Sequence, residues 1–197
     1  YQWYSNTVNS TSGGTLIPGA TNISYSPTSA NVGTMYYYCI STLSSGGAAC
    51  GTVTTQTAAV TTVGLPSINT QPTATQTLCV GGTPTLLSLT YSGGTGTASY
   101  QWYSNTTNAT TGGTLINGAT LSSYTPPTMN AVGSFYYYGV ASLSGSGCGL
   151  VTSSAAEIVV IGDPTISAQP TTTQTVCSGG VVSALTIAAS GGTGTTS

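Results

Sequence analysis

The sequence predicts an all-β protein made of tandem β-sandwich modules, and three observations lead to this prediction. The 197 residues contain the same motifs twice, for example YQWYSNT at residues 1–7 and again at residues 100–106. Gly, Pro, Ser and Thr fill the intervals between short apolar and aromatic runs, which breaks any helical period and favours short strands joined by turns. Hydrophobic residues make up 39% of the chain, with 13 Tyr and 2 Trp, so the chain has enough apolar surface to form a core.

The repeat covers the whole chain and sets the expected module boundaries. The segments 63–67 (VGLPS) and 161–165 (IGDPT) have the composition of linkers, and the Pro in each suits the start of a first strand. We therefore expect a complete module at 66–162, the rear part of a module at 1–65 and the front strands of the next module at 163–197. On this interpretation the chain is cut out of phase with its repeat, and residues 163–197 of one copy complete residues 1–65 of an adjacent copy. Two arrangements fit this expectation: a peptide bond joins the copies in one giant chain, or separate chains exchange strands.

Within the complete module, turn signals such as SGGTG, INGA and PPT separate about seven strand-like runs. Seven short strands in a module of this length predict a β-sandwich with Greek-key connections. The expected strands, in order, lie near residues 67–71, 84–91, 99–104, 114–116, 121–125, 134–143 and 150–161.

The aromatic residues refine the prediction to an immunoglobulin-like sandwich. Trp102 and its counterpart Trp3 lie in the expected third strand, where such a sandwich buries a Trp between its sheets. Tyr137 and its counterpart Tyr37 lie near the start of the expected sixth strand, where a tyrosine corner is found. We expect these four residues to mark the core.

Several motifs resemble the Ig-like repeats of giant cell-surface adhesins from gliding, type IX-secreting Bacteroidota. They are Y-Q-W-Y-S-N-T, GAT-x-x-S-Y-x-P, V-G-x-x-Y-Y-Y and a Cys-x-Gly-Gly before the second strand, and together they span the chain. The resemblance implies an exported protein at the cell surface, a stalk of many modules, and an adhesive or filamentous role.

Five cysteines in a chain without His predict disulfides formed in an oxidising compartment. Cys79 precedes the second expected strand and Cys148 lies between the last two, so we expect both at one end of the sandwich, joined by an intra-module disulfide. Cys50 and Cys177 would then pair with neighbouring copies. Cys39 has Gly139 as its counterpart, and we expect it to be a buried free thiol.

The charge content excludes several kinds of function. Without Lys or Arg the chain has no electrostatic attraction for nucleic acid or anionic lipid. No apolar run reaches the roughly 20 residues that a membrane helix needs, so we expect no membrane insertion. Cys39 lacks a His to activate it, and Glu157 and Asp163 are too few to hold calcium or to form an acid/base pair that belongs to the repeat. We expect no enzyme activity and no cofactor or metal.

These observations favour a structural repeat of an extracellular filament or adhesin stalk, which binds copies of itself end to end and gives reach and mechanical strength. One alternative is a carbohydrate-binding module, in which outward tyrosines of the runs 36–38 and 136–138 and rows of Thr contact a surface polysaccharide. Another is an accessory region that tethers a catalytic domain outside these residues. An exposed aromatic row shared by both repeats would favour the carbohydrate-binding module.

Overall fold

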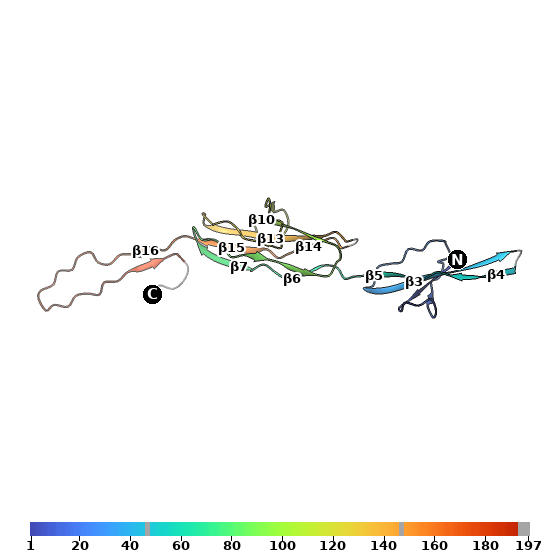
Figure 1. Ribbon diagram of the computed structural model, residues 1–197. Coiled ribbons are helices and arrows are strands. Elements are labelled where there is room, and N and C mark those ends of the chain that lie inside the picture. Colours follow the sequence, from blue (N-terminus) through green and yellow to red (C-terminus); the bar gives the residue numbers. More distant parts are fainter. Residues whose placement is uncertain (46–47, 146–147, 193–197) are drawn as a thin grey trace. The chain divides into compact units, whose positions relative to one another are not determined.

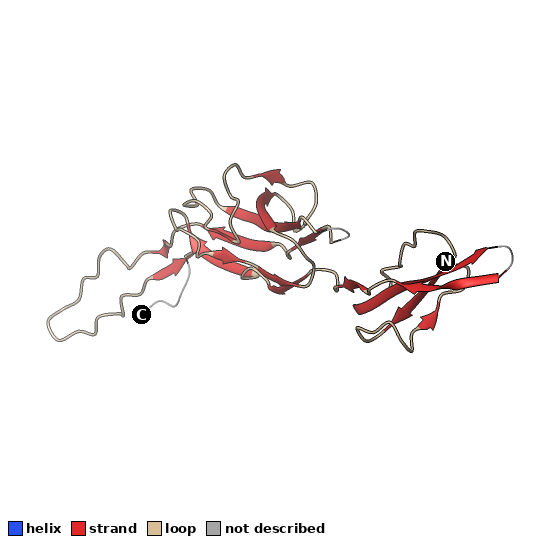
Figure 2. Ribbon diagram, turned by 45° about the vertical axis from the view of Figure 1, so that its right-hand side comes forward, coloured by secondary structure: helices blue, strands red, loops and turns tan. Residues whose placement is uncertain are grey.

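The computed structural model describes all residues except 46–47, 146–147 and 193–197. The described residues form strands and loops with no helix, as Figure 2 shows, so the predicted all-β class is confirmed. The chain divides into two compact units, Tyr1–Leu65 and Pro66–Ser197, which are described separately below. The separation of residues 163–197 from the complete module and their role in completing another copy stay predictions.

The first unit is a single antiparallel sheet, labelled in part in Figure 1. The strands follow the order β2-β1-β3-β4, and β5 also pairs with β3. The long strand β3 therefore pairs directly with β1, β4 and β5, and β2 joins the sheet through β1. The strands are β1 (Gln2–Asn6), β2 (Thr15–Leu16), β3 (Gly33–Ser45), β4 (Ala48–Thr54) and β5 (Ala58–Thr62).

The second unit contains a six-stranded sheet in the order β11-β10-β13-β15-β7, with β14 also paired to β13. All its strand pairs are antiparallel except β7 and β15, which are parallel. Smaller two-stranded sheets pair β6 with β9, β8 with β12, and β16 with β17. The strands are β6 (Ser67–Thr70), β7 (Thr75–Cys79), β8 (Leu87–Ser88), β9 (Thr90–Ser92), β10 (Ala98–Asn105), β11 (Thr114–Leu115), β12 (Ser123–Tyr124), β13 (Gly133–Leu143), β14 (Leu150–Thr152), β15 (Ala156–Ile161), β16 (Thr165–Ala168) and β17 (Ala188–Ser190).

The core of the second unit lies between the six-stranded sheet and the segment that carries β8. Leu87 and Leu89 come from that segment, and they pack in one buried cluster with Trp102 and Ile158 of the large sheet. None of these four side chains is more than 1% exposed. The arrangement is sandwich-like, since apolar side chains from two sheet layers meet face to face.

The sequence repeat is also a repeat of strand pairing. Trp102 lies opposite Gly139 in β10 and β13, and its counterpart Trp3 lies opposite Cys39 in β1 and β3. The next strand pair is also equivalent in the two units. Tyr137 of β13 lies opposite Ala156 of β15, and Tyr37 of β3 lies opposite Ala58 of β5. Equivalent residues therefore take equivalent places in the two units.

Three strand predictions differ from the structure. The run expected at 84–91 forms two short strands, β8 and β9, which pair with β12 and β6 respectively. Residues 75–79, expected to lie outside any strand, form β7. The sequence does not reveal this strand because the polar Gln76 occupies a half-buried position and so interrupts the hydrophobic alternation to which Leu78 belongs. The Gln76 amide instead bonds to both backbone groups of Thr85 (N–O distances of 2.7 and 3.3 Å). The run expected at 150–161 is divided into β14 and β15 by residues 153–155.

The described residues include no helix with the length and apolar character of a membrane-crossing segment.

Candidate functional site

An aromatic group fills the centre of the second unit. Trp102 is fully buried, and its Nε1 donates a hydrogen bond to the Leu121 carbonyl at 2.9 Å. The Trp102 ring lies 6.0 Å from that of Tyr124, which lies 5.9 Å from that of Tyr137. Burial raises the pKa of the Tyr137 hydroxyl, and the neighbouring Tyr124 raises it further. Trp102 and Tyr137 thus lie in the core region that the sequence indicated for them.

The same aromatic group is present but incompletely covered in the first unit. Trp3 Nε1 donates to the Asn22 carbonyl at 3.0 Å, and the Trp3–Tyr25 and Tyr25–Tyr37 ring distances are 6.0 and 5.9 Å. Tyr37 is buried, but Trp3 is only half-buried. No residues of the first unit correspond to Leu87 and Leu89, the side chains that cover Trp102.

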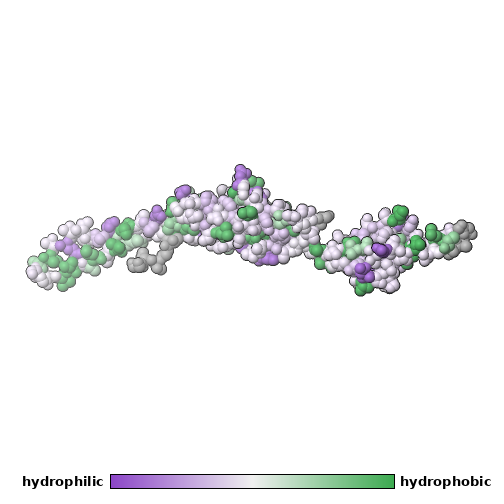
Figure 3. Space-filling view, in the orientation of Figure 1, coloured by the Kyte–Doolittle hydropathy of each residue, from purple (hydrophilic) through white to green (hydrophobic). Residues whose placement is uncertain are grey.

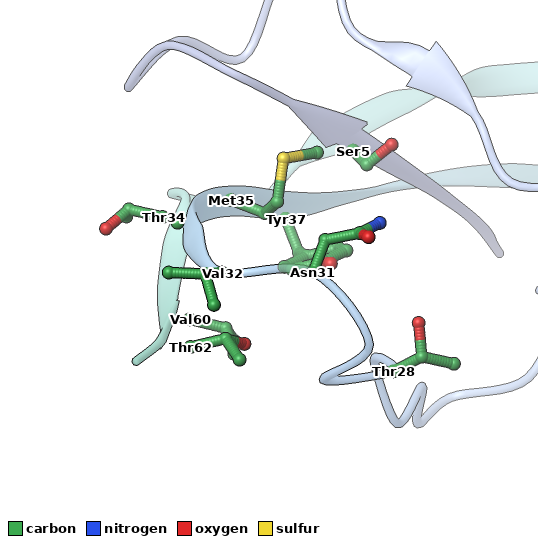
Figure 4. A pocket seen from close by; sticks show the side chains of 10 residues that line it. Ser5, Thr28, Asn31, Val32, Thr34, Met35, Tyr37, Val60 and Thr62 are labelled. Carbon is green, nitrogen blue, oxygen red and sulfur yellow. The ribbon is translucent and has the colours of Figure 1, made fainter. Parts of the chain in front are cut away.

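A hollow of about 360 Å³ lies on the inner face of the first unit (Figure 4). Met35 and Tyr37 of β3 and Val60 and Thr62 of β5 contribute to its wall. In the second unit the β15 counterparts of Val60 and Thr62 are Ile158 and Val160, which are 0% and 1% exposed. The β5 side of the hollow therefore corresponds to buried positions of the complete module. The other side recurs there as a hollow of about 300 Å³, lined in part by Ser104, Phe135 and Tyr137.

Tyrosine pairs stack on the opposite face of each main sheet. The Tyr103 and Tyr138 rings are 5.1 Å apart and nearly parallel, and the Tyr4 and Tyr38 rings are 5.2 Å apart. Tyr38 and Tyr138 point away from the core as expected, but they are only 3% and 4% exposed. An open sugar-stacking row that includes these two tyrosines is therefore not present.

The loop before β11 covers the stacked pair in the second unit. Gly113 N donates to the Tyr138 hydroxyl at 3.3 Å, and a Cβ at Gly113 would lie 2.8 Å from the Tyr138 ring. Asn105 holds the same loop, because its Nδ2 donates to the Ala109 and Thr111 carbonyls at 3.1 Å each. No sequence pattern indicated these structural roles of Gly113 and Asn105, although both residues recur in the first unit as Gly14 and Asn6.

The expected disulfide between Cys79 and Cys148 is wrong for one module, because the two residues lie at opposite ends of β13. Cys79 pairs with Ile161, next to the register position where Val160 meets Gly133, the first residue of β13. Cys148 lies beyond the other end of β13, where Leu143 N donates to the Gly149 carbonyl. Eleven residues of β13 separate these ends by roughly 30 Å, whereas a disulfide needs Cα atoms within about 7 Å.

The other cysteines are placed as follows. Cys39 is a buried free thiol in β3, 4% exposed, with its Sγ 3.7 Å from the Ile40 carbonyl. Cys50 lies exposed in β4 and Cys177 in the exposed segment between β16 and β17. Cys50 and Cys177 are the counterparts of Cys148 and Cys79. A bridge between them in a module shared by two copies would have to join the same opposite ends, so the strand register excludes that bridge as well.

One known family matches part of the chain. Residues 68–162 match the model of a family described as Domain of unknown function (DUF8696). The matched segment runs from β6 to the residue after β15 and contains the whole core cluster of the second unit. The chain matches no curated protein. The DUF8696 match thus coincides with the complete module and leaves its function open.

The two carboxylates lie on either side of the end of the DUF8696 match. Glu157, inside the matched segment, accepts a hydrogen bond from the Tyr136 hydroxyl at 3.0 Å across the β13–β15 pair. Asp163, just outside it, is exposed. Over residues 1–45, 48–145 and 148–192, no group of three or more His, Cys, Asp or Glu side chains could hold a metal ion.

Proposed function

We propose that this chain is a structural repeat of an extracellular filament or adhesin stalk, built from tandem immunoglobulin-like sandwiches. One observation carries the proposal: the same strands, in the same register, recur in both units with the same aromatic group at their centre. A chain that repeats its packing in this way converts repeat number into length, because each module forms its core mainly from its own residues.

Composition supports a location at the cell surface. Charged residues make up 1% of the chain, and hydroxyl and amide side chains solvate the surface in their place. Such a surface has little like-charge repulsion to prevent self-association, which suits a protein that assembles with its own copies. The absence of Lys and Arg leaves no site for trypsin-like proteases, which suits a protein exposed outside the cell. The motifs shared with Bacteroidota adhesin repeats agree with this location.

The stalk is a better-supported role than the carbohydrate-binding module. An aromatic platform for sugars needs rings that are open to solvent, and Tyr38 and Tyr138 are buried under loops in both units. The stacked tyrosine pairs contribute to module stability instead, by about 0.5–1.5 kcal/mol each beyond their buried area.

The proposal is tested by measuring length against repeat number. Genes encoding increasing numbers of the 66–162 module in tandem would be expressed, and the contour length of single molecules measured by atomic force microscopy. We expect the length to rise in proportion to the number of modules. Antibodies against residues 66–162 should label the surface of intact source cells. Collapsed particles of constant size, or labelling only after cell lysis, would contradict the proposal.

A further inference from the structure

The two flanking parts of the chain hold complementary halves of one module. Residues 1–65 are the counterparts of residues 100–163, and residues 163–192 are the counterparts of residues 65–94. In the complete module the two counterpart segments pack against each other around Trp102. Each flanking part therefore carries side chains whose counterparts in the complete module pack against the counterparts of the other part.

Apolar side chains that are buried in the complete module are exposed at the equivalent positions of residues 163–192. Leu185 and Ile187 are 65% and 66% exposed, whereas their counterparts Leu87 and Leu89 are 0% and 1% exposed. Figure 3 shows apolar residues gathered over the segment that follows β16. The inner face of residues 1–65 has the hollow in Figure 4, and Val60 and Thr62 on its wall are the counterparts of the buried Ile158 and Val160. A second hollow of the same unit is lined in part by Trp3 and Cys39. Trp3 and Cys39 are the counterparts of Trp102 and Gly139, beside which Leu89 lies in the complete module.

The main chain gives a second correspondence. In the complete module β7 adds a parallel strand to the edge of β15. Among the described residues, β5, the counterpart of β15, pairs only with β3. Residues 173–177, the counterparts of β7, form no strand. One unpaired edge and one unpaired strand segment are therefore available for the same pairing.

Two paired substitutions support a match between the flanking parts. In the complete module a Cβ at Gly139 would lie 2.4 Å from Leu89 Cδ2, so a side chain larger than hydrogen does not fit opposite this Leu. In the flanking parts, Cys39 replaces Gly139 and Ile187 replaces Leu89. Ile branches at Cβ and lacks the Leu Cδ2 methyl, so it leaves room for the Cys side chain.

We propose that residues 163–192 of one copy fill the open face of residues 1–65 in a second copy. Residues 173–177 add a parallel strand beside β5, and Leu185 and Ile187 cover the half-buried Trp3, with Ile187 packed beside Cys39. This inference deepens the proposed function, because it supplies the joint between subunits, and it rests on the repeat organisation proposed there. It does not depend on export or on adhesion.

The first test is sedimentation of the 197-residue chain over a wide range of concentration. We expect end-to-end oligomers that lengthen as the concentration rises. Leu185→Asp places a charge at the position equivalent to fully buried Leu87 and should weaken association by more than about tenfold. The matched control is Val181→Asp, because Val181 is 92% exposed and its counterpart Thr83 is also exposed. A wild-type chain that stays monomeric, or equal effects of the two substitutions, would overturn the proposal.

The second test uses the pair Cys39 and Ile187 to distinguish specific packing from non-specific association. Ile187→Leu in the presence of Cys39 recreates the clash and should weaken association about tenfold. Adding Cys39→Gly recreates the Gly139–Leu89 combination and should restore association. A double variant as weak as Ile187→Leu would overturn the proposed register. If association fails while tandem modules still extend in proportion to their number, the proposed contact between copies is wrong and the proposed stalk function is still supported. If association succeeds but intact cells are not labelled by the antibodies, the contact between copies is supported and the proposed location at the cell surface is wrong.

Discussion

Gly139→Ala should destabilise the complete module, and the structure gives the size of the effect. The new methyl would lie 2.4 Å from Leu89 Cδ2 and 3.2 Å from the Trp102 ring. Both neighbours are at most 1% exposed, so they lie in the core, where a shift of one side chain disturbs its packed neighbours. Overpacking of this kind costs about 1–3 kcal/mol, while the lower chain entropy of Ala in the unfolded state returns only about 0.4–1 kcal/mol. We expect a net loss of about 1–2 kcal/mol, because the cost of overpacking exceeds the entropic gain.

The assay is urea unfolding followed by tryptophan fluorescence in a Trp3→Phe background, in which Trp102 alone reports on the complete module. The control is Gly162→Ala, because a Cβ at Gly162 has no neighbour within 4 Å and its backbone has no positive φ. The control should stay within about 0.5 kcal/mol of the parent. Adding Leu89→Ile to Gly139→Ala should recover part of the loss. A Gly139→Ala midpoint equal to that of the control would refute the close contact with Leu89.

Three further outcomes follow from the geometry. Mass spectrometry of thermolysin peptides from the oxidised monomer should contain no pair linking Cys79 to Cys148, and finding that pair would contradict the strand register. Because burial raises the folded-state pKa of Tyr137 above 10.0, the unfolded chain releases the proton first; stability should therefore fall as the pH rises above 10.0, seen as a falling urea midpoint. Tyr137→Phe should reduce that fall, and an unchanged fall would exclude this hydroxyl as its source. Asn105→Ala removes two hydrogen bonds to loop carbonyls and should cost about 1–2 kcal/mol in the same urea assay, whereas Asn108→Ala in that loop should cost little.

Much of the fold could be predicted because the chain contains the same pattern twice. Two copies of a motif at a fixed interval reveal which residues keep their place, and Trp102 and Tyr137 were found in this way. Strand β7 was missed because Gln76 bonds to the backbone of Thr85 and takes a half-buried place that sequence patterns reserve for apolar residues. A local polar contact of this kind leaves no trace in hydrophobic alternation.

Side-chain direction could be predicted where exposure could not. Strand alternation correctly directs Tyr138 away from the core that holds Tyr137. Whether an outward ring reaches solvent depends on what covers it, and here the loop at Gly113 does so. The signal was present as a pair of adjacent glycines that recurs in both repeats, but a recurring glycine indicates close backbone approach without naming the side chain that approaches.

The repeat in the sequence could not predict which cysteines lie close enough to pair. A pair of cysteines that recurs once per repeat can in principle be joined within one module or between successive modules, and the sequence interval is the same in both cases. Only strand register decides, because it fixes the end of the module at which each cysteine lies. The parallel pairing of β7 with β15 places Cys79 beside Ile161, and the β13–β14 hairpin places Cys148 at the far end of the same sheet. That pair is the parallel one in the sheet, and no hairpin joins its two strands, so turn signals could not have predicted it.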